Sequence, residues 1–76
     1  MEEINNILIG DKVKYWRKEK GLTQDLLAKK SSVPYTTIAK IESGVIKNPS
    51  IQTMIKISRG LDISLNDLID KIANSK

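Results

Sequence analysis

Residues 21–44, which read GLTQDLLAKKSSVPYTTIAKIESG, decide the fold of this chain. Thr23 suits the N-cap position of a helix, because its hydroxyl can accept a hydrogen bond from a free backbone N–H of the first turn. Leu27 and Ala28 supply an inward face, and Asp25 suits the positive end of the helix dipole. The stretch therefore predicts a short helix over residues 24–30.

A second short helix follows after a turn at Ser31 and Ser32. It begins around Pro34, because the proline ring presets φ for a helix start, and it ends at Gly44, a residue that tolerates the left-handed conformation. Neither helix is long enough to be stable alone. The three or four residues between them are typical of helix-turn-helix spacing. In this second helix, Ile38 and Ile41 are three residues apart and are predicted to face the core. The residues predicted to point elsewhere are Tyr35, Thr36, Thr37 and Lys40.

A longer helix precedes this pair. Ile9, Val13 and Trp16 fall at helical spacing and predict one apolar face. The helix starts between residues 5 and 8 and ends at Gly21, with Gly10 weakening the pattern at its start. Basic residues occupy the rest of its surface: Lys12, Lys14, Arg17, Lys18 and Lys20.

Two further helices follow the central pair. Ser50 and Ser64 are their predicted N-caps. Their apolar positions are Ile51, Met54, Ile55 and Ile57 in the first, and Leu65, Leu68, Ile69 and Ile72 in the second. Since no stretch alternates apolar and polar residues over the length of a strand, the chain is predicted to be an all-α, five-helix domain.

The composition excludes several classes of site. The 76 residues include no cysteine and no histidine, which excludes disulfide scaffolds, zinc fingers, cysteine nucleophiles and histidine bases. We therefore expect no catalysis, metal or cofactor, and no apolar run is long enough to span a membrane. The formal net charge is +4; residues 11–47 sum to +5, and the rest of the chain sums to −1. This basic half is a candidate footprint for a polyanion.

Residues 9–69 resemble the lambda-repressor-like (XRE-type) helix-turn-helix family of DNA-binding domains. The resemblance rests on IGDKVKYWRKEKGLTQDLLAKK, SSVPYTTIAKIESG, NPSIQTMIKISRGL and DISLNDLI, and above all on GLTQ, LA, IxxIExG and PS in combination. It implies a compact DNA-binding domain over 9–69, with the helix-turn-helix at about 23–42. Residues 1–8 are then an N-terminal extension or part of the first helix, and residues 70–76 the end of the last helix and a tail.

The resemblance implies a set of DNA contacts. Base edges in the major groove are the expected targets of Tyr35, Thr36 and Lys40. Phosphates are the expected targets of Thr23, Gln24, Thr37, Ser43, Lys47 and Asn48. Gln24 suits this role because a helix N-terminus attracts anions. The alternatives are that Lys40 is a solvated helix residue and that Tyr35 packs over Pro34 or a neighbouring helix.

The resemblance also assigns structural positions. Arg17 and Glu42 occupy sites that form an ion pair in phage-repressor relatives, the alternative being two independent surface charges. Trp16 stands where the family places a core leucine. The chain departs from the pattern at Ser32 and Asp62, where the family has glycine, and at Gly60, where it has alanine.

The expected function is sequence-specific binding of double-stranded DNA by a cytoplasmic, nucleoid-associated transcriptional regulator, with repression as the expected sign and a bacterial or phage origin. Such domains bind as dimers to near-palindromic operators. Candidate dimer contacts are Ile69, Ile72, Ile4 and Ile7, unless the N-terminal segment folds back over its own core. The alternative function is an antitoxin-like or antirepressor-like module whose main partner is another protein. Phage repressors, restriction–modification controllers and antitoxins all remain open.

Overall fold

The computed structural model describes the backbone of residues 9–74 and the side chains of residues 9–69. Over this range the regular secondary structure is five α-helices joined by turns and loops, which confirms the predicted all-α, five-helix class. The helices are α2 (Ile9–Glu19), α3 (Gln24–Ser31), α4 (Tyr35–Ser43), α5 (Ile51–Leu61) and α6 (Leu65–Asn74).

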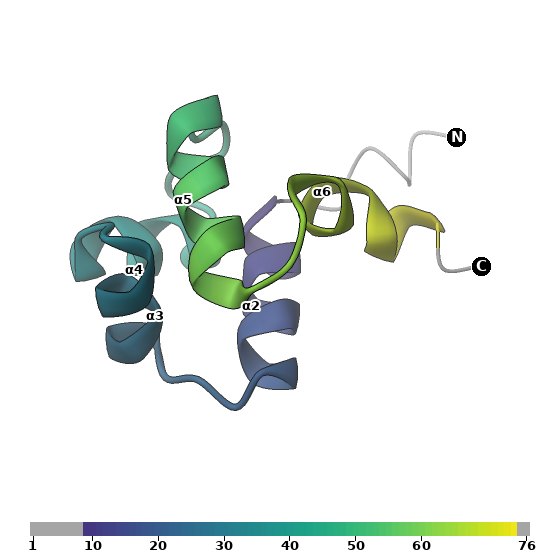
Figure 1. The fold of residues 1–76 in the computed structure, drawn as a ribbon. Coiled ribbons are helices and arrows are strands. Elements are labelled where there is room, and N and C mark those ends of the chain that lie inside the picture. The colour runs from purple at the N-terminus through teal and green to yellow at the C-terminus, as the bar shows by residue number, and fades with distance from the viewer. Residues whose placement is uncertain (1–8, 75–76) are drawn as a thin grey trace.

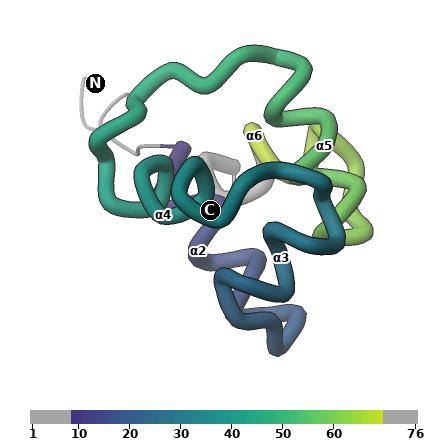
Figure 2. The backbone as a smooth tube through the Cα atoms, turned by 90° about the vertical axis from the view of Figure 1, so that its left-hand side faces the viewer, coloured from purple at the N-terminus to yellow at the C-terminus, as the bar shows by residue number. Residues whose placement is uncertain are grey.

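The two central helices lie on the side of the molecule opposite α6, and α2 and α5 lie between (Figure 1). The segment from α4 to α5 runs as a wide arc beside them (Figure 2). The core lies where these helices meet, and its fully buried side chains are Val13, Leu27, Ile38, Ile41, Ile57, Leu61 and Leu68. The inner face of α4 is thus part of the core, while its other side remains available.

All three predicted N-caps are confirmed. The hydroxyl of Thr23 accepts a hydrogen bond from the backbone N–H of Leu26 at 3.1 Å. Ser50 and Ser64 accept in the same way from the residues three positions on, at 3.1 and 3.0 Å. Local sequence therefore fixes where α3, α5 and α6 begin.

The predicted start of the helix around Pro34 is confirmed, because α4 begins at Tyr35 and Pro34 is its N-cap with extended backbone (ψ 143°). Another local prediction is wrong. Ile51, predicted as an apolar face position of α5, is 55% exposed. It is the first residue of α5, and the buried residues of this helix lie in its C-terminal half, from Ile57 to Leu61.

Lys12 also departs from the expectation that it lies on a solvated face. Its residue surface is only 9% exposed, and its ammonium group donates a hydrogen bond to the backbone carbonyl of Ile69 in α6. A lysine can be buried in this way because its long stem is apolar and its charged end still finds an acceptor.

The departures at Ser32 and Asp62 have a backbone consequence. Both residues adopt the left-handed conformation, with φ of 60° and 62°, at the ends of α3 and α5. An L-residue with a Cβ atom is strained there, and glycine is not. Backbone strain is therefore present at Ser32 and Asp62, the C-caps of α3 and α5.

Gly10 and Gly60 lie inside helices because other backbone approaches them closely. A Cβ atom at Gly10 would lie 2.0 Å from the carbonyl oxygen of Ile41. A Cβ at Gly60 would lie 2.8 Å from the Cβ of Ser31, so α5 can pack against α3 only without a side chain at this position. Glycine lowers the helix propensity at both positions, and the close packing between helices that it permits compensates for this loss.

We therefore expect Gly60→Ala to destabilise the protein by about 1–3 kcal/mol, because overpacking outweighs alanine's better helix propensity. Thermal and urea unfolding would measure the change. A higher melting temperature would show that propensity dominates and that the close contact with Ser31 is unimportant.

Ser32→Gly is the companion variant, since it should act in the opposite direction. Removing the Cβ atom from a left-handed residue should raise the free energy of unfolding by about 1 kcal/mol. Ser43→Gly, at an exposed residue within α4, is the matched control and should lower it instead.

Candidate nucleic-acid interface

Helix α4 presents a polar outer face over a buried inner face. Tyr35 is 49% exposed, and Thr36 and Lys40 are also exposed. Ile38 and Ile41, from the same helix, are fully buried. The three residues predicted to reach base edges are therefore accessible together, at the N-terminal end and middle of α4.

The N-terminus of α4 carries no side-chain cap among the described residues. The carbonyl oxygen of Pro34 accepts from the N–H groups of Thr37 and Ile38, at 3.0 and 3.1 Å. Proline has no side-chain oxygen that could satisfy the earlier N–H groups of the helix. This end of α4 is thus a polar, positively polarised surface next to Tyr35 and Thr36.

The predicted phosphate-contact residues lie at the start of α3, along α4 and in the segment after α4. Thr23, Ser43, Lys47 and Asn48 are exposed, and Gln24 and Thr37 are half-buried. The Ser43 hydroxyl donates to the carbonyl oxygen of Lys40 at 3.2 Å, so its proton is already engaged within α4. The Thr23 hydroxyl accepts its capping bond and keeps its own proton available.

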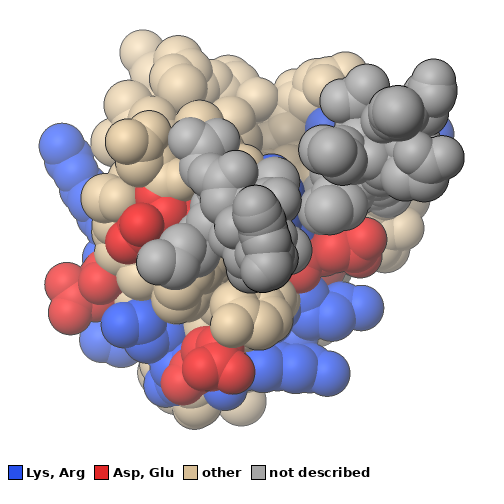
Figure 3. All heavy atoms as spheres, turned by 90° about the vertical axis from the view of Figure 1, so that its right-hand side faces the viewer, with Lys and Arg blue, Asp and Glu red and all other residues tan. Residues whose placement is uncertain are grey.

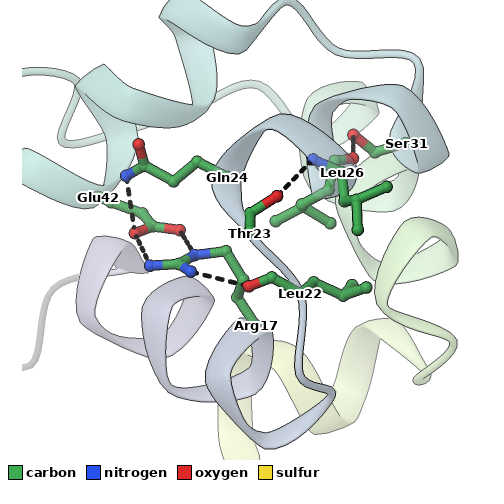
Figure 4. A network of polar contacts seen from close by, with 8 residues as sticks. Arg17, Leu22, Thr23, Gln24, Leu26, Ser31 and Glu42 are labelled. Carbon is green, nitrogen blue, oxygen red and sulfur yellow. Dashed lines mark hydrogen bonds and ion pairs between the residues drawn. The ribbon is translucent and has the colours of Figure 1, made fainter.

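Arg17 and Glu42 form a two-pronged ion pair between α2 and α4 (Figure 4). Arg17 Nε lies 2.7 Å from Glu42 Oε2, and Arg17 Nη2 lies 3.0 Å from Oε1. The Glu42 side chain is 2% exposed and that of Arg17 13%. The structure thus contains the pair that the family resemblance implied, and the alternative of two independent surface charges is wrong.

Two further bonds extend this pair. Arg17 Nη1 donates to the carbonyl oxygen of Leu22 at 2.9 Å, and Gln24 Nε2 donates to Glu42 Oε1 at 3.1 Å. The sequence contained no signal for either bond, because both depend on how α2, α3 and α4 meet in space. Gln24, predicted as a free phosphate ligand, therefore has one of its two N–H groups already in use.

The charge of this side of the molecule is basic. Between residues 22 and 50 the exposed charged residues are Asp25, Lys29, Lys30, Lys40 and Lys47, and Glu42 is buried against Arg17. The face seen from the α6 side instead shows acidic and basic side chains interspersed over its described part (Figure 3). The charge distribution thus favours the α3–α4 side for a polyanionic partner.

The predicted dimer contacts lie largely beyond what is described. Ile69 is half-buried on α6. Ile4, Ile7 and the side chain of Ile72 lie outside the described residues. Within the described part of the chain, no helix is long and apolar enough to cross a bilayer, and no acidic side chains cluster as metal ligands do.

A family model described as "Helix-turn-helix" matches residues 13–68, which include all of α3, α4 and α5. The chain belongs to the lambda-repressor-like helix-turn-helix family. This confirms the resemblance drawn from the motifs of the sequence.

Within this family, the chain is 41% identical over 64 residues to the HTH-type transcriptional regulator SinR of Bacillus subtilis. The match covers 84% of this chain and 58% of SinR, so the chain spans less than two thirds of that relative. A crystal structure described as the master regulator for biofilm formation SinR in complex with DNA is similar with a TM-score of 0.78. It is 41% identical, and the match covers 83% of this chain and all of that one.

A structure of a SinR–SinI protein complex is also similar, with a TM-score of 0.78 and 40% identity. That match covers 86% of this chain and 63% of the other. Both SinR structures share the fold found here, with TM-scores of 0.78.

Glu42→Ala should destabilise the protein by about 3–5 kcal/mol, because it leaves the guanidinium of Arg17 buried without its partner. Chemical denaturation would measure the loss. Asp25→Ala is the matched control, since Asp25 is paired with Lys29 at 3.5 Å on the exposed surface, and its loss should cost about 0–1 kcal/mol. Equal effects of the two changes would argue against a structural role for the Arg17–Glu42 pair.

Proposed function

We propose that this chain is a transcriptional regulator, and specifically a repressor, that binds double-stranded DNA sequence-specifically by inserting α4 into the major groove. The observation that carries the proposal is the outer face of α4, where Tyr35, Thr36 and Lys40 are exposed over buried isoleucines. The similarity to a SinR structure in complex with DNA supports it. The role is binding rather than catalysis, in the cytoplasm where the nucleoid lies.

Phosphate contacts would orient the domain without reading sequence. The exposed Thr23 and the start of α3 would hold the backbone on one side of the groove. Lys47 and Asn48, exposed after α4, would hold it on the other. The N-terminus of α4 has no side-chain cap, so its free backbone N–H groups would also face the DNA.

Base contacts would come from the middle and start of α4. The ammonium group of Lys40 can donate to O6 and N7 of guanine. Thr36 offers a methyl group to thymine or a hydroxyl to either base, and Tyr35 offers an aromatic face or a hydroxyl. This set of groups can discriminate among base pairs in a way that phosphate contacts cannot.

Selection from random duplexes with the full chain tests the proposal. It should return a defined site, and Lys40→Ala should relax preference at one base pair and weaken binding by about 5- to 150-fold. Lys47→Ala should weaken binding to all DNA sequences equally. It should also reduce the slope of log K against log salt concentration by about 1. Lys18→Ala, at an exposed lysine of α2, serves as control. Recovery of no preferred sequence would reject sequence-specific binding.

We further propose that the chain acts as a homodimer on a near-palindromic operator, because one recognition helix reads only a few base pairs. The half-exposed Ile69 is one contact available to a second copy. With about four phosphates neutralised by each protomer, a dimer should give a slope of log K against log salt near −7, and a monomer about half of that. Sedimentation at micromolar concentration should show twice the 8.5 kDa chain mass. A single 8.5 kDa species in sedimentation would reject the dimer.

The second candidate is a module whose main partner is a protein. Val45 and Ile51, at either end of the α4–α5 segment, are 69% and 55% exposed, and a SinR–SinI complex is among the similar structures. The two candidates separate cleanly by mutation. A protein-binding module would keep its partner after Thr36→Ala and Lys40→Ala, whereas a DNA-binding regulator would lose its operator.

A further inference from the structure

Gln24 is hydrogen-bonded to Glu42, a residue to which the proposed DNA interface assigns no contact. Its Nε2 donates to Glu42 Oε1 at 3.1 Å, and the two residues come from different helices, α3 and α4. Figure 4 shows the amide nitrogen directed toward Glu42 and the amide oxygen directed away from it. Glu42 itself cannot move freely, because Arg17 holds both of its carboxylate oxygens in a buried site.

The chemistry of this contact fixes the orientation of the amide. Carboxylate oxygens paired with a guanidinium only accept hydrogen bonds, so they select the NH₂ group of the glutamine and exclude its carbonyl oxygen. An NH₂ group carries two hydrogens. One is used on Glu42, and the second is left for an acceptor outside the protein.

We propose that Glu42 is a positioning residue for DNA binding, which holds the Gln24 amide so that its second N–H donates to a phosphate oxygen at the N-terminus of α3. The inference rests on the proposed function, because it assigns a role within the same DNA interface. A glutamine side chain is flexible, and holding it in place before binding removes the ordering cost that would otherwise weaken the phosphate contact.

The same contact links the two parts of the interface. Glu42 lies on α4, which carries the base-reading residues, and Gln24 lies at the start of α3, which contacts the backbone. Glu42 thereby sets the distance between the Gln24 amide, which would bind the phosphate, and α4, which would read the bases. A duplex must offer its phosphate and its bases at that spacing to use both.

A double-mutant cycle tests the inference with the selected operator and the full chain. Gln24→Ala is made in the wild-type chain and in a background with Arg17→Met and Glu42→Met, which replaces the ion pair by apolar side chains, an exchange that is often tolerated. We expect Gln24→Ala to weaken binding about tenfold in the wild-type chain and less than about threefold in the background. Gln52→Ala, at the exposed second glutamine of the chain, should change neither affinity.

An equal loss in both chains would overturn the inference, because Gln24 would then contribute without Glu42. Failure of the wild-type chain to bind any duplex would instead reject the proposed function. Should the background variant fail to fold, side-chain amide NMR of the wild-type chain decides. The Gln24 amide protons should exchange more slowly than those of Gln52 before DNA is added, and one of them should shift on binding. Exchange at the rate of Gln52 would overturn the inference.

Discussion

The buried ion pair between Arg17 and Glu42 sets the geometry on which the proposed interface depends. It joins α2 to the C-terminal half of α4, and Arg17 also holds the carbonyl of Leu22 in the segment that leads into α3. Hydrophobic packing alone is non-directional and lets neighbouring helices slide or rotate. A two-pronged guanidinium–carboxylate pair has directional bonds, so it fixes how α4 lies on the core.

Close backbone contacts complement this polar link. Gly10 brings α2 against the backbone of α4 at Ile41, and Gly60 brings α5 against α3 at Ser31. A domain of this size has little apolar surface to bury, and close approach increases what each helix covers. The helix propensity lost at both glycines is therefore balanced by tertiary contact rather than by local structure.

Local rules predicted the parts of the fold that local chemistry determines. The caps at Thr23, Ser50 and Ser64 and the left-handed residue at Gly44 follow from side chains within three or four residues. The accessible face of α4 followed from the spacing of its isoleucines.

What could not be predicted depends on partners distant in sequence. Lys12 completes an i, i+3, i+4, i+7 pattern with Ile9, Val13 and Trp16, so its position indicated the core face, but its charge led to a solvated assignment. Its acceptor lies in α6, 57 residues away. The bond from Gln24 to Glu42 likewise crosses 18 residues, and no spacing rule connects them. The candidate interface was thus predictable as a set of exposed residues, and the network that positions them was not.

Helix α4 shows how stability and recognition can be divided between two faces of one element. Nine residues without a side-chain cap are too few to be stable as a helix alone, so Ile38, Ile41 and Glu42 must hold it from the inner face. Tyr35, Thr36 and Lys40 are exposed on the outer face, so their identity can follow the demands of the partner more than those of the core. The missing cap fits this division, because N–H groups left without an internal acceptor at that end can be satisfied by water or by a bound duplex.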